Sequence, residues 1–562
     1  MICVEHIRVS FFVSFYKGIY AIIGRNKKRR GECVETSLIL CAVVIITCIL
    51  TNKLTNRIGV PAVLVFMAIG MVFGSEGIFK IPFDNFGIAE KICSTALVFI
   101  MFYGGFGTSL KAAKPVLKQS ICMSTLGVVL TSVLTGVFCH YVLHMSLKEG
   151  MLLGAVVGST DAASVFSILR SKQLNLKDGT ASILEVESGS NDPVAYMMTM
   201  IILSWMSLSN QNIVWMLIKQ IGVGFLFGIG VGVLAVWSLK HIEFEIEGMD
   251  TILMIALVLL AYAGSVLLGG NGYLSVYLQG IIIGNQKFDH KVALIHFFDG
   301  INHLAQILIF FLLGLLVFPS QLLGIAGSAI LVFIGLTFIA RPIATFLLLL
   351  PFRASFKQKT LIAFSGLRGA ASIVFAIMVT VSPVYTKSDV FNIVFCVALI
   401  SVTFQGLLLP VVAERLDMVD DGQNVMKTFS DYQEEQQIQL IQMKMEKDHK
   451  YVGKKISELR IKNMLIVLIK RGDEDIIPRA EVKIKEGDIL VLSAQSYEGD
   501  IDMVLREETV EEGDGRIGCQ IKDLPKMEER MIALIRREDG STVIPKGETV
   551  IQKGDVLAIS GN

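Results

Sequence analysis

Two acidic residues stand inside apolar stretches of this chain and constrain its fold more than any other feature. Asp161 follows Thr160 in LLGAVVGSTDAASVFSIL. Asp192 follows Asn191 in ILEVESGSNDPVAYMMTMII. A carboxylate at membrane depth costs several kcal/mol unless it is paired, hydrated or protonated, so it is first considered as an ion or proton site. Two carboxylates, each beside a polar oxygen donor, predict a place where a cation and a proton compete.

The composition places these residues in a membrane protein. Of 562 residues, 53% are hydrophobic and 18% are charged, which excludes an ordinary soluble protein and indicates a polytopic membrane protein. The net charge of +1 provides no basic surface, so no nucleic-acid partner is expected. The nine cysteines are scattered without a CxxC pair, and neither a disulfide framework nor a zinc site is expected.

Apolar segments of spanning length fill the chain up to residue 415. A spanning helix needs about 20 mainly apolar residues, and the hydropathy rule predicts roughly thirteen such helices. They are expected near 36–52, 59–76, 87–108, 119–143, 149–170, 181–205, 211–239, 250–269, 273–286, 299–318, 322–350, 359–380 and 389–413. Residues 36–415 are therefore predicted to form a transmembrane domain surrounded by membrane lipid.

Basic residues in alternate loops predict the orientation. Lys and Arg gather near 53–57, 111–118, 170–177, 287–291 and 353–359, and the opposite loops hold few. The positive-inside rule makes the first set cytoplasmic, so the hydrophilic region after residue 415 is expected in the cytoplasm of a multi-pass protein of the cell membrane. Residues 1–35 do not fit this rule, because a basic cluster at 26–30 would face outward. This N-terminal extension is assigned no function.

Two of the predicted helices contain residues that favour helix breaks and caps. These are residues 158–161 (GSTD) and 365–369 (SGLRG). They fall in the fifth and twelfth predicted helices, as mates in an inverted repeat would, and matched interruptions are the best sequence indication of a transporter binding site. Asp161 and Arg368 are candidates to neutralise the exposed helix ends. The alternative is local packing, with Arg368 extending to the membrane surface.

The helix predicted at 181–205 carries a polar face. Four residues share it because they fall at positions i, i+1, i+4 and i+5: Glu187, Ser188, Asn191 and Asp192. Pro193 loosens the backbone hydrogen bonding locally. Burial disfavours the charged form of a carboxyl group and a bound cation favours it, so Asp192 is predicted to hold either a proton or a metal cation. Glu187 is more plausible as a structural partner of Arg368, and a purely structural Asp192 is the alternative.

Three motifs carry a resemblance to a known family. GSTDAASVFSILR, LEVESGSNDPVA and SGLRGAASIVFAI closely resemble the sodium/proton exchanger superfamily. The nearest match is the NhaP-type monovalent cation:proton antiporters, especially the bacterial potassium/proton branch with a cytoplasmic regulatory tail. The resemblance covers roughly residues 36–415, and it implies a helical fold with inverted repeats and broken helices.

The resemblance also implies roles for the site residues. Asp192 carries the ion, with the monovalent cation at Asp192 and Asp161. Other residues help to coordinate the ion: Thr160, Asp161, Ser188 and Asn191. Glu187 and Arg368 form a stabilising ion pair. An Asn-Asp pair rather than two aspartates goes with one-for-one, electroneutral exchange in that superfamily, and a homodimer is favoured. No cofactor and no enzymatic activity are implied.

A glycine series in the helix at 211–239 has four-residue spacing. Gly224, Gly228 and Gly232 permit the close approach of another helix. The sequence does not distinguish packing within the subunit from a contact in a dimer.

The hydrophilic tail contains a weak internal repeat. After a polar linker at 416–432, residues 464–494 align with 531–561, and Pro478 and Gly487 match Pro545 and Gly554. Residues 433–562 resemble TrkA-C domains (regulator of potassium conductance, C-terminal), with copies at 433–505 and 510–562. The resemblance implies a small α+β module that senses a small-molecule regulator. The alternative is a tail needed only for assembly.

One motif in the tail is a decoy. Residues 513–518 fit GxGxxG, but a dinucleotide site needs an apolar strand before the turn and a helix after it. Glutamates lie just upstream of the turn and Pro525 interrupts the segment downstream of it, so nucleotide binding is not expected.

Three classes of function compete. The leading hypothesis is secondary antiport of a cytoplasmic monovalent cation, potassium favoured and sodium possible, against protons. A ligand-gated cation channel is the alternative, although a channel needs rings of carbonyls or charges along a pore, and no TVGYG-like filter is present. An intramembrane enzyme or receptor is the third class, and no paired catalytic motif supports it.

Overall fold

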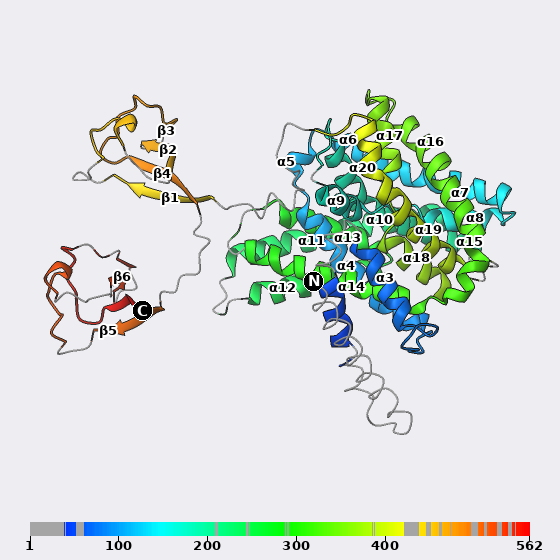
Figure 1. Ribbon diagram of the computed structural model, residues 1–562, viewed down its shortest axis with the longest axis horizontal. Helices are drawn as coiled ribbons and strands as arrows, with labels where there is room; N and C mark the ends of the chain where they lie inside the picture. Colours follow the sequence, from blue (N-terminus) through cyan, green and yellow to red (C-terminus); the bar gives the residue numbers. More distant parts are fainter. Residues whose placement is uncertain are drawn as a thin grey trace, which may run out of the picture. The chain divides into compact units, whose positions relative to one another are not determined.

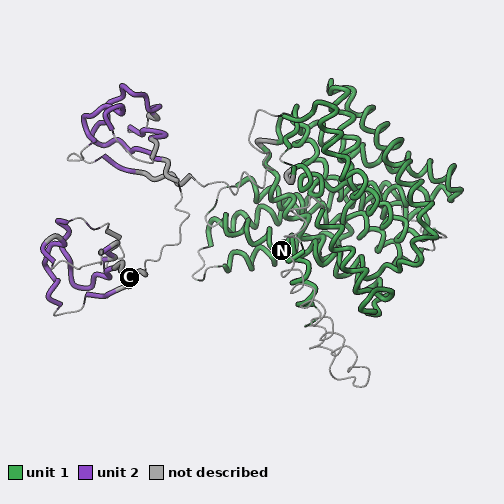
Figure 2. The backbone as a smooth tube through the Cα atoms, in the orientation of Figure 1, with its two compact units in different colours: residues 1–434 green, residues 435–562 purple. Residues whose placement is uncertain are grey.

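The computed structural model shows a helical unit and a β-rich unit (Figure 1). The two compact units are Met1–Glu434 and Glu435–Asn562 (Figure 2). The described residues are 39, 41–51, 61–172, 174–207, 212–242, 246, 248–286, 288, 291–384, 386, 388–420, 438–445, 451–459, 464–471, 474–495, 504–510, 514–524, 531–537, 542–543, 545, 547–561. The N-terminal extension at 1–35 lies outside them, as does most of the predicted linker.

The first unit is built from α-helices with three π-helical stretches. Its first half contains Cys41–Thr51, α3 (Ala62–Phe73), α4 (Phe86–Gly107), α5 (Leu110–Ala113), α6 (Leu117–Cys122), η2 (Met123–Gly127), α7 (Val128–Val142), α8 (Leu147–Val156), α9 (Ala162–Ser171) and α10 (Thr180–Met206). Its second half contains α11 (Ile213–His241), α12 (Met249–Leu267), α13 (Gly272–Gly284), α14 (Lys291–Leu316), α15 (Pro319–Ile334), η3 (Gly335–Ala340), α16 (Arg341–Leu348), α17 (Phe356–Phe364), α18 (Ala370–Val381), α19 (Val390–Ile400), η4 (Ser401–Gln405) and α20 (Gly406–Arg415).

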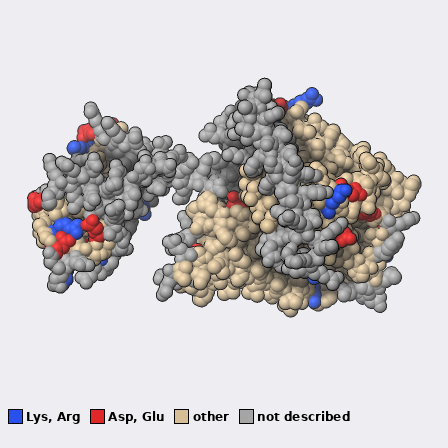
Figure 3. All heavy atoms as spheres, turned by 60° about the horizontal axis from the view of Figure 1, so that its bottom comes forward, with Lys and Arg blue, Asp and Glu red and all other residues tan. Residues whose placement is uncertain are grey.

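Seven helical stretches among the described residues are long and apolar enough to cross a membrane. They are Phe86–Gly107, Leu117–Val142, Ile213–His241, Met249–Leu267, Lys291–Leu316, Pro319–Leu348 and Val390–Arg415. On the face shown in Figure 3, the described surface of this unit is mainly uncharged. Large apolar side chains of this unit, such as Leu226, Leu267 and Leu323, are exposed, as expected for a surface in contact with lipid. The number of about thirteen helices and the inverted repeat stay predictions.

Glycines set the closest helix contacts of the first unit. A Cβ atom at Gly105 of α4 would collide with the carbonyl oxygen of Tyr277 in α13, and one at Gly284 would collide with that of Phe106. Small residues therefore let the two backbones approach, as they commonly do in membranes.

The glycine series of α11 serves the same kind of packing. A Cβ at Gly224 would lie 2.9 Å from the carbonyl oxygen of Asn271, and one at Gly228 would lie 2.7 Å from that of Ser275. Both partners belong to α13 or to the residue that caps it. The structure thus uses these two glycines for packing within the subunit, which answers the question that the spacing left open.

Two helices are interrupted where the sequence predicted breaks, which confirms that prediction. α8 ends at Val156 and α9 begins at Ala162, while α17 ends at Phe364 and α18 begins at Ala370. The two non-helical segments contact one another: the Asp161 backbone N–H donates to the Leu367 carbonyl over 2.8 Å. At Gly369 a Cβ would lie 2.5 Å from the Cβ of Asp161, so this contact requires a residue without a side chain.

The second unit contains two antiparallel four-stranded sheets with the same strand order. The strands of the first sheet are β1 (Ile438–Lys444), β2 (Met464–Arg471), β3 (Glu474–Ile476) and β4 (Ile489–Gln495), in the order β1-β4-β2-β3. Those of the second are β5 (Val504–Thr509), β6 (Met531–Arg536), β7 (Thr542–Val543) and β8 (Val556–Gly561), in the order β5-β8-β6-β7. The internal repeat of the sequence is therefore a repeat of topology.

The same ion pair recurs in both sheets. Arg471 donates to Asp488 over 2.8 Å at each carboxylate oxygen, and Arg537 donates to Asp555 over 2.8 Å. Both carboxylates are buried. Each guanidinium also donates to the carbonyl of a residue in an isolated β-bridge, Lys483 in the first copy and Val550 in the second, so the pair ties this bridge to the sheet.

The GxGxxG decoy is part of this repeated structure. Gly518 has φ +79 and leads into a 3-10 helix, Ile521–Asp523. Gly453 in the first copy has φ +84 and leads into the 3-10 helix Ile456–Glu458. Within residues 514–524 no α-helix follows the turn, so the context that a dinucleotide site requires is missing there.

Candidate ion-binding site

The polar face of α10 lies against the interruption between α8 and α9. The hydroxyl of Ser159 donates to Asp192 Oδ1. Asn191 Nδ2 donates to Thr160 Oγ1 over 2.6 Å. Asp192 is 7% exposed and Asn191 is fully buried, so the carboxylate lies inside the protein, beside backbone that is not helical.

Ser188 fixes the backbone of the interruption. Its hydroxyl donates to the Thr160 carbonyl over 2.8 Å and accepts from the Ala162 backbone N–H over 2.9 Å. Backbone groups freed by the end of one helix and the start of the next thus find a partner on α10, as buried backbone groups must. The structure brings Ser188, Asn191 and Asp192, which share one face of α10, to Thr160 and its neighbours.

Asp161 lies at the start of α9 and is engaged there. Ser164 Oγ donates to Asp161 Oδ2 over 2.6 Å, and the Ser164 backbone N–H donates to Oδ1 over 3.3 Å. A carboxylate in this position satisfies an end group of the helix and opposes its partial positive charge.

Arg368 neutralises the other side of the interruption. Its Nη1 atom donates to the carbonyl of Ser159 over 2.7 Å and to that of Gly158 over 3.2 Å. These carbonyls follow the C-terminal end of α8, where partial negative charge accumulates. Arg368 is 2% exposed, so these backbone carbonyls meet its positive charge inside the protein.

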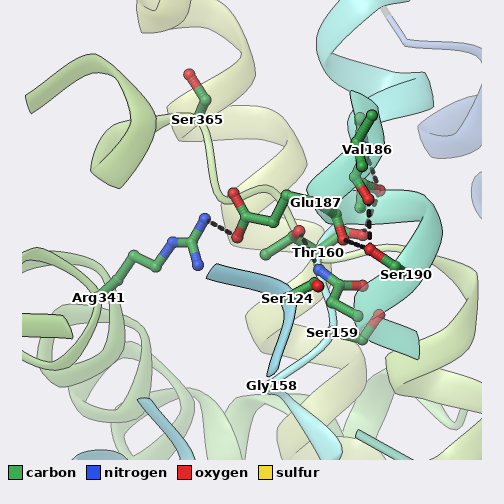
Figure 4. Close-up of polar contacts among 12 residues, drawn as sticks. Ser124, Gly158, Ser159, Thr160, Val186, Glu187, Ser190, Arg341 and Ser365 are labelled. Carbon is green, nitrogen blue, oxygen red and sulfur yellow. Dashed lines mark hydrogen bonds and ion pairs between the residues drawn. The ribbon is translucent and has the colours of Figure 1, made fainter. Parts of the chain in front are cut away.

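The predicted ion pair between Glu187 and Arg368 is wrong. Glu187 Oε1 pairs with Arg341 Nη2 of α16 at 2.5 Å, and Figure 4 shows the two side chains pointing toward one another. The physical reason is that Arg368 is committed to the carbonyls after α8, whereas Arg341 enters the same interior from another helix.

Two oxygen atoms of the α10 face have no hydrogen-bond partner among the described residues. They are Asn191 Oδ1 and Glu187 Oε2, and both are buried. Buried polar atoms normally have a partner, so an unpaired oxygen needs an explanation such as water or an ion. Carboxylate, amide and hydroxyl oxygens are ligands that suit hard cations. No group of three or more His, Cys, Asp and Glu residues in the described part of the chain suits a transition metal.

Sequence reasoning missed two participants, Ser159 and Arg341. Ser159 was recognised only as part of a helix break, and its contact with Asp192 depends on how the break is folded. The sequence does contain an indication of Arg341, because this charged residue stands alone among apolar residues in FIGLTFIARPIATFLLLL. The rule that selected Asp161 and Asp192 applies to it equally.

Two interrupted helices that meet beside a buried carboxylate are typical of a polytopic membrane transporter. The chain belongs to the sodium/hydrogen exchanger, transmembrane family, whose model matches residues 42–415. The TrkA-C domain model matches the tail twice, at 440–498 and 505–562. The resemblance inferred from the three motifs and from the tail repeat is therefore confirmed.

Relatives are found among proteins named as antiporters. The chain is 36% identical over 390 residues to the K(+)/H(+) antiporter NhaP of Alkalimonas amylolytica, covering 69% of this chain and 68% of that one. It is 34% identical over 389 residues to the K(+)/H(+) antiporter NhaP2 of Shewanella oneidensis, covering 68% and 67%. A similar fold is found in the solved structure of the sodium proton antiporter MjNhaP1 from Methanocaldococcus jannaschii at pH 8, with a TM-score of 0.62. The two chains are 24% identical, and the match covers 68% of this chain and 99% of that one.

Proposed function

We propose that the protein exchanges a cytoplasmic monovalent cation for protons across the cell membrane, with the proton gradient as the energy source. The observation that carries this proposal is the buried Asp192 carboxylate, which accepts a hydrogen bond from Ser159 where two interrupted helices meet. Interrupted helices near a buried charge are the usual form of a transporter ion site. Membership of the exchanger family supports the same function.

Asp192 is the group that a proton and a cation share in turn. Only one of them neutralises the carboxylate well at a time, so binding of one releases the other. Ser159 and Thr160 supply hydroxyl oxygens close by, and Asn191 holds Thr160 in place. Ser188 fixes the backbone between them, and Asp161 contributes negative charge from the start of α9.

Exchange is one cation for one proton, and hence electroneutral. Asn191 occupies the position before Asp192 where a second carboxylate would add another titrating charge. With a single carrier the charge moved by the cation equals the charge moved by the proton. The transport rate is then insensitive to the membrane potential.

Potassium is the favoured cation and sodium is possible. Relatives more than 30% identical are named K(+)/H(+) antiporters, which supports potassium. A relative at 28% identity is named Na(+)/H(+) antiporter 1, and the MjNhaP1 structure is titled a sodium proton antiporter. Side-chain oxygens bind either ion, so selectivity depends on cavity size and ligand number.

The tail, residues 433–562, lies in the cytoplasm and regulates exchange in a homodimer. Lysines and arginines of alternate loops support this orientation. The two TrkA-C matches support a sensor of a small-molecule regulator, and the two sheets share one strand order.

Proteoliposome exchange tests the proposal. Potassium, sodium and lithium are added in turn outside vesicles that hold a pH gradient, and its cation-dependent dissipation is recorded. Asp192→Asn should abolish dissipation because an amide cannot carry a proton. Asp84→Asn is the matched control, since Asp84 is an exposed acid in the loop before α4. Normal exchange by Asp192→Asn would exclude this residue as the carrier, and steep voltage dependence of the wild type would exclude electroneutral exchange.

A further inference from the structure

After α20 the chain turns and is hydrogen-bonded to the loop between α9 and α10. We call residues 416–420 the exit segment and residues 174–179 the α9–α10 loop. Leu176 and Val419 form an isolated antiparallel bridge. The Lys177 backbone N–H donates to the Met418 carbonyl over 2.9 Å, and the Asp420 N–H donates to the Asn175 carbonyl over 3.0 Å.

Asp417 adds an ionic contact to this backbone pairing. Its carboxylate accepts from Lys177 Nζ over 3.0 Å and lies 3.3 Å from Lys357 Nζ. Lys357 belongs to the first turn of α17, the first half of the second interrupted helix. Hydrogen bonds from Lys177 and then Lys357 hold the pKa of Asp417 below its ordinary value, so the carboxylate stays charged near neutral pH.

The α9–α10 loop is held from a second side by α17. Gln358 Nε2 donates to the Asp178 carbonyl over 2.9 Å and to Thr180 Oγ1 over 3.3 Å. Gln358 and Thr180 are both buried. The loop therefore links α9, α10 and α17 at one end of the unit, and these are the elements that carry or adjoin Asp161, Asp192 and the second interruption.

We propose that the exit segment is the element through which the tail controls the ion site, with Asp417 as the latch. This inference rests on the proposed antiport and names its regulatory contact. The exit segment continues along the chain into the first TrkA-C copy, which begins at β1. A displacement of the exit segment is transmitted to the α9–α10 loop through the two backbone hydrogen bonds and the contact of Asp417 with Lys177. With Asp417 in place, the α9–α10 loop restrains the movement of α9 and α10 that carries Asp192 from one side of the membrane to the other. The tail controls how strongly the loop is restrained.

A double-mutant cycle in the full-length chain tests the coupling. Asp417→Asn removes the charge of the latch but tolerates the positive φ of +54 at this position, as Asn commonly does. Asp488→Asn/Asp555→Asn removes the ion pairs of both tail copies. Initial exchange rates are measured against cation concentration for the wild type, the latch variant, the tail variant and their combination.

The expected result is non-additive. The tail variant should shift the activation curve in the wild-type background, and Asp417→Asn should remove more than half of that shift. Asp84→Asn, an acid remote from the exit segment in the sequence, should leave it intact. Additive shifts of the activation curve in the latch and tail variants would overturn the proposal. The proposal would also be overturned if the tail variant lost hydrogen-exchange protection in its sheets but exchanged ions like the wild type.

Cross-linking provides a second test that does not depend on the latch charge. Leu176→Cys/Val419→Cys places two thiols at bridge partners, whose spacing in antiparallel pairs suits a disulfide. Oxidation should abolish the effect of the tail variant, and reduction should restore it, while each single cysteine variant responds like the wild type. An unchanged tail effect after oxidation would contradict the proposal. Failure of antiport itself would be distinct, because the wild type would then show no more exchange than Asp192→Asn.

Discussion

Glu187 Oε1 and Arg341 Nη2 lie 2.5 Å apart in the interior of the first unit, and both side chains are at most 3% exposed. The pair joins α10 to α16. The remaining carboxylate oxygen of Glu187 and the Nε atom of Arg341 have no hydrogen-bond partner among the described residues. A single hydrogen-bonded contact therefore joins the two buried charges, and loss of either partner removes the ion pair of the other.

The first prediction concerns this pairing. Glu187→Gln or Arg341→Gln should each cost about 3–5 kcal/mol, because one buried charge remains unpaired. The double variant should recover part of this loss. The measurement is thermal unfolding of the purified protein in detergent, arranged as a double-mutant cycle.

Arg368→Gln provides the contrast for this cycle. Arg368 bonds the carbonyls of Gly158 and Ser159 rather than a carboxylate. The losses of stability caused by Arg368→Gln and Glu187→Gln should therefore be nearly additive. The losses caused by Arg341→Gln and Glu187→Gln should not be additive. Strong coupling of Glu187 to Arg368 and none to Arg341 would contradict the observed pairing.

A second prediction concerns the hydroxyl group at Asp192. Ser159→Ala removes a hydrogen bond to a charged group, which is worth about 1.5–3 kcal/mol. The apparent cation affinity should fall roughly tenfold or more, since each 1.4 kcal/mol is a factor of ten. The measurement is exchange rate against cation concentration in proteoliposomes.

Ser190→Ala is the matched control for that experiment. Ser190 lies on α10, as Asp192 does, but its hydroxyl donates to the Val186 carbonyl of the same helix over 2.5 Å. Its loss should leave the cation affinity close to that of the wild type. If Ser159→Ala and Ser190→Ala behave alike, the Ser159 hydroxyl has no special part in ion binding.

The sequence predicted the components of the site better than their pairing. Residue types alone revealed both interruptions, since Gly, Ser and Asp favour helix ends, and the apolar surroundings exposed Asp192. Which arginine meets Glu187 depends on how α16 and the second interruption pack against α10. Side-chain spacing along one helix carries no information on that choice.

Helix packing shows the same limit. The four-residue spacing of Gly224, Gly228 and Gly232 predicted a close contact but not its partner. The contact of Gly105 with α13 was not predicted at all, because Gly104 and Gly105 look alike in the sequence. Only the structure shows that one glycine faces a backbone carbonyl and the other faces open space.

This difference supplies the third prediction. Gly105→Ala places a methyl group against the Tyr277 carbonyl and should destabilise the protein by about 1–3 kcal/mol. At Gly104 nothing lies within 4 Å of the added Cβ. Gly104→Ala should be neutral, or stabilising by up to about 1 kcal/mol through its better helix propensity. Thermal unfolding in detergent compares the two variants, and equal melting temperatures would refute the assigned contact.

The fourth prediction concerns the pH dependence of the tail. Burial of Asp488 favours its neutral form, but hydrogen bonds from Arg471 and from the Lys485 backbone N–H outweigh this, so the pKa lies below its ordinary value. A carboxyl group whose pKa is lowered by folding stabilises the folded state above the unfolded-state pKa, about 3.9. That contribution is lost as the pH falls through the lower, folded-state pKa.

Asp488→Asn should therefore weaken the first sheet at neutral pH, and the difference from the wild type should shrink at pH values below about 4. Hydrogen–deuterium exchange of peptides from β2 and β4 measures this in the full-length protein. Variant and wild type are compared at the same pH, so that the chemical exchange rate cancels. Asp555→Asn is the matched control, because it breaks the corresponding pair of the second sheet and should reduce protection of β6 and β8 instead. Equal protection of β2 and β4 in Asp488→Asn and the wild type at neutral pH would show that the ion pair does not stabilise its sheet.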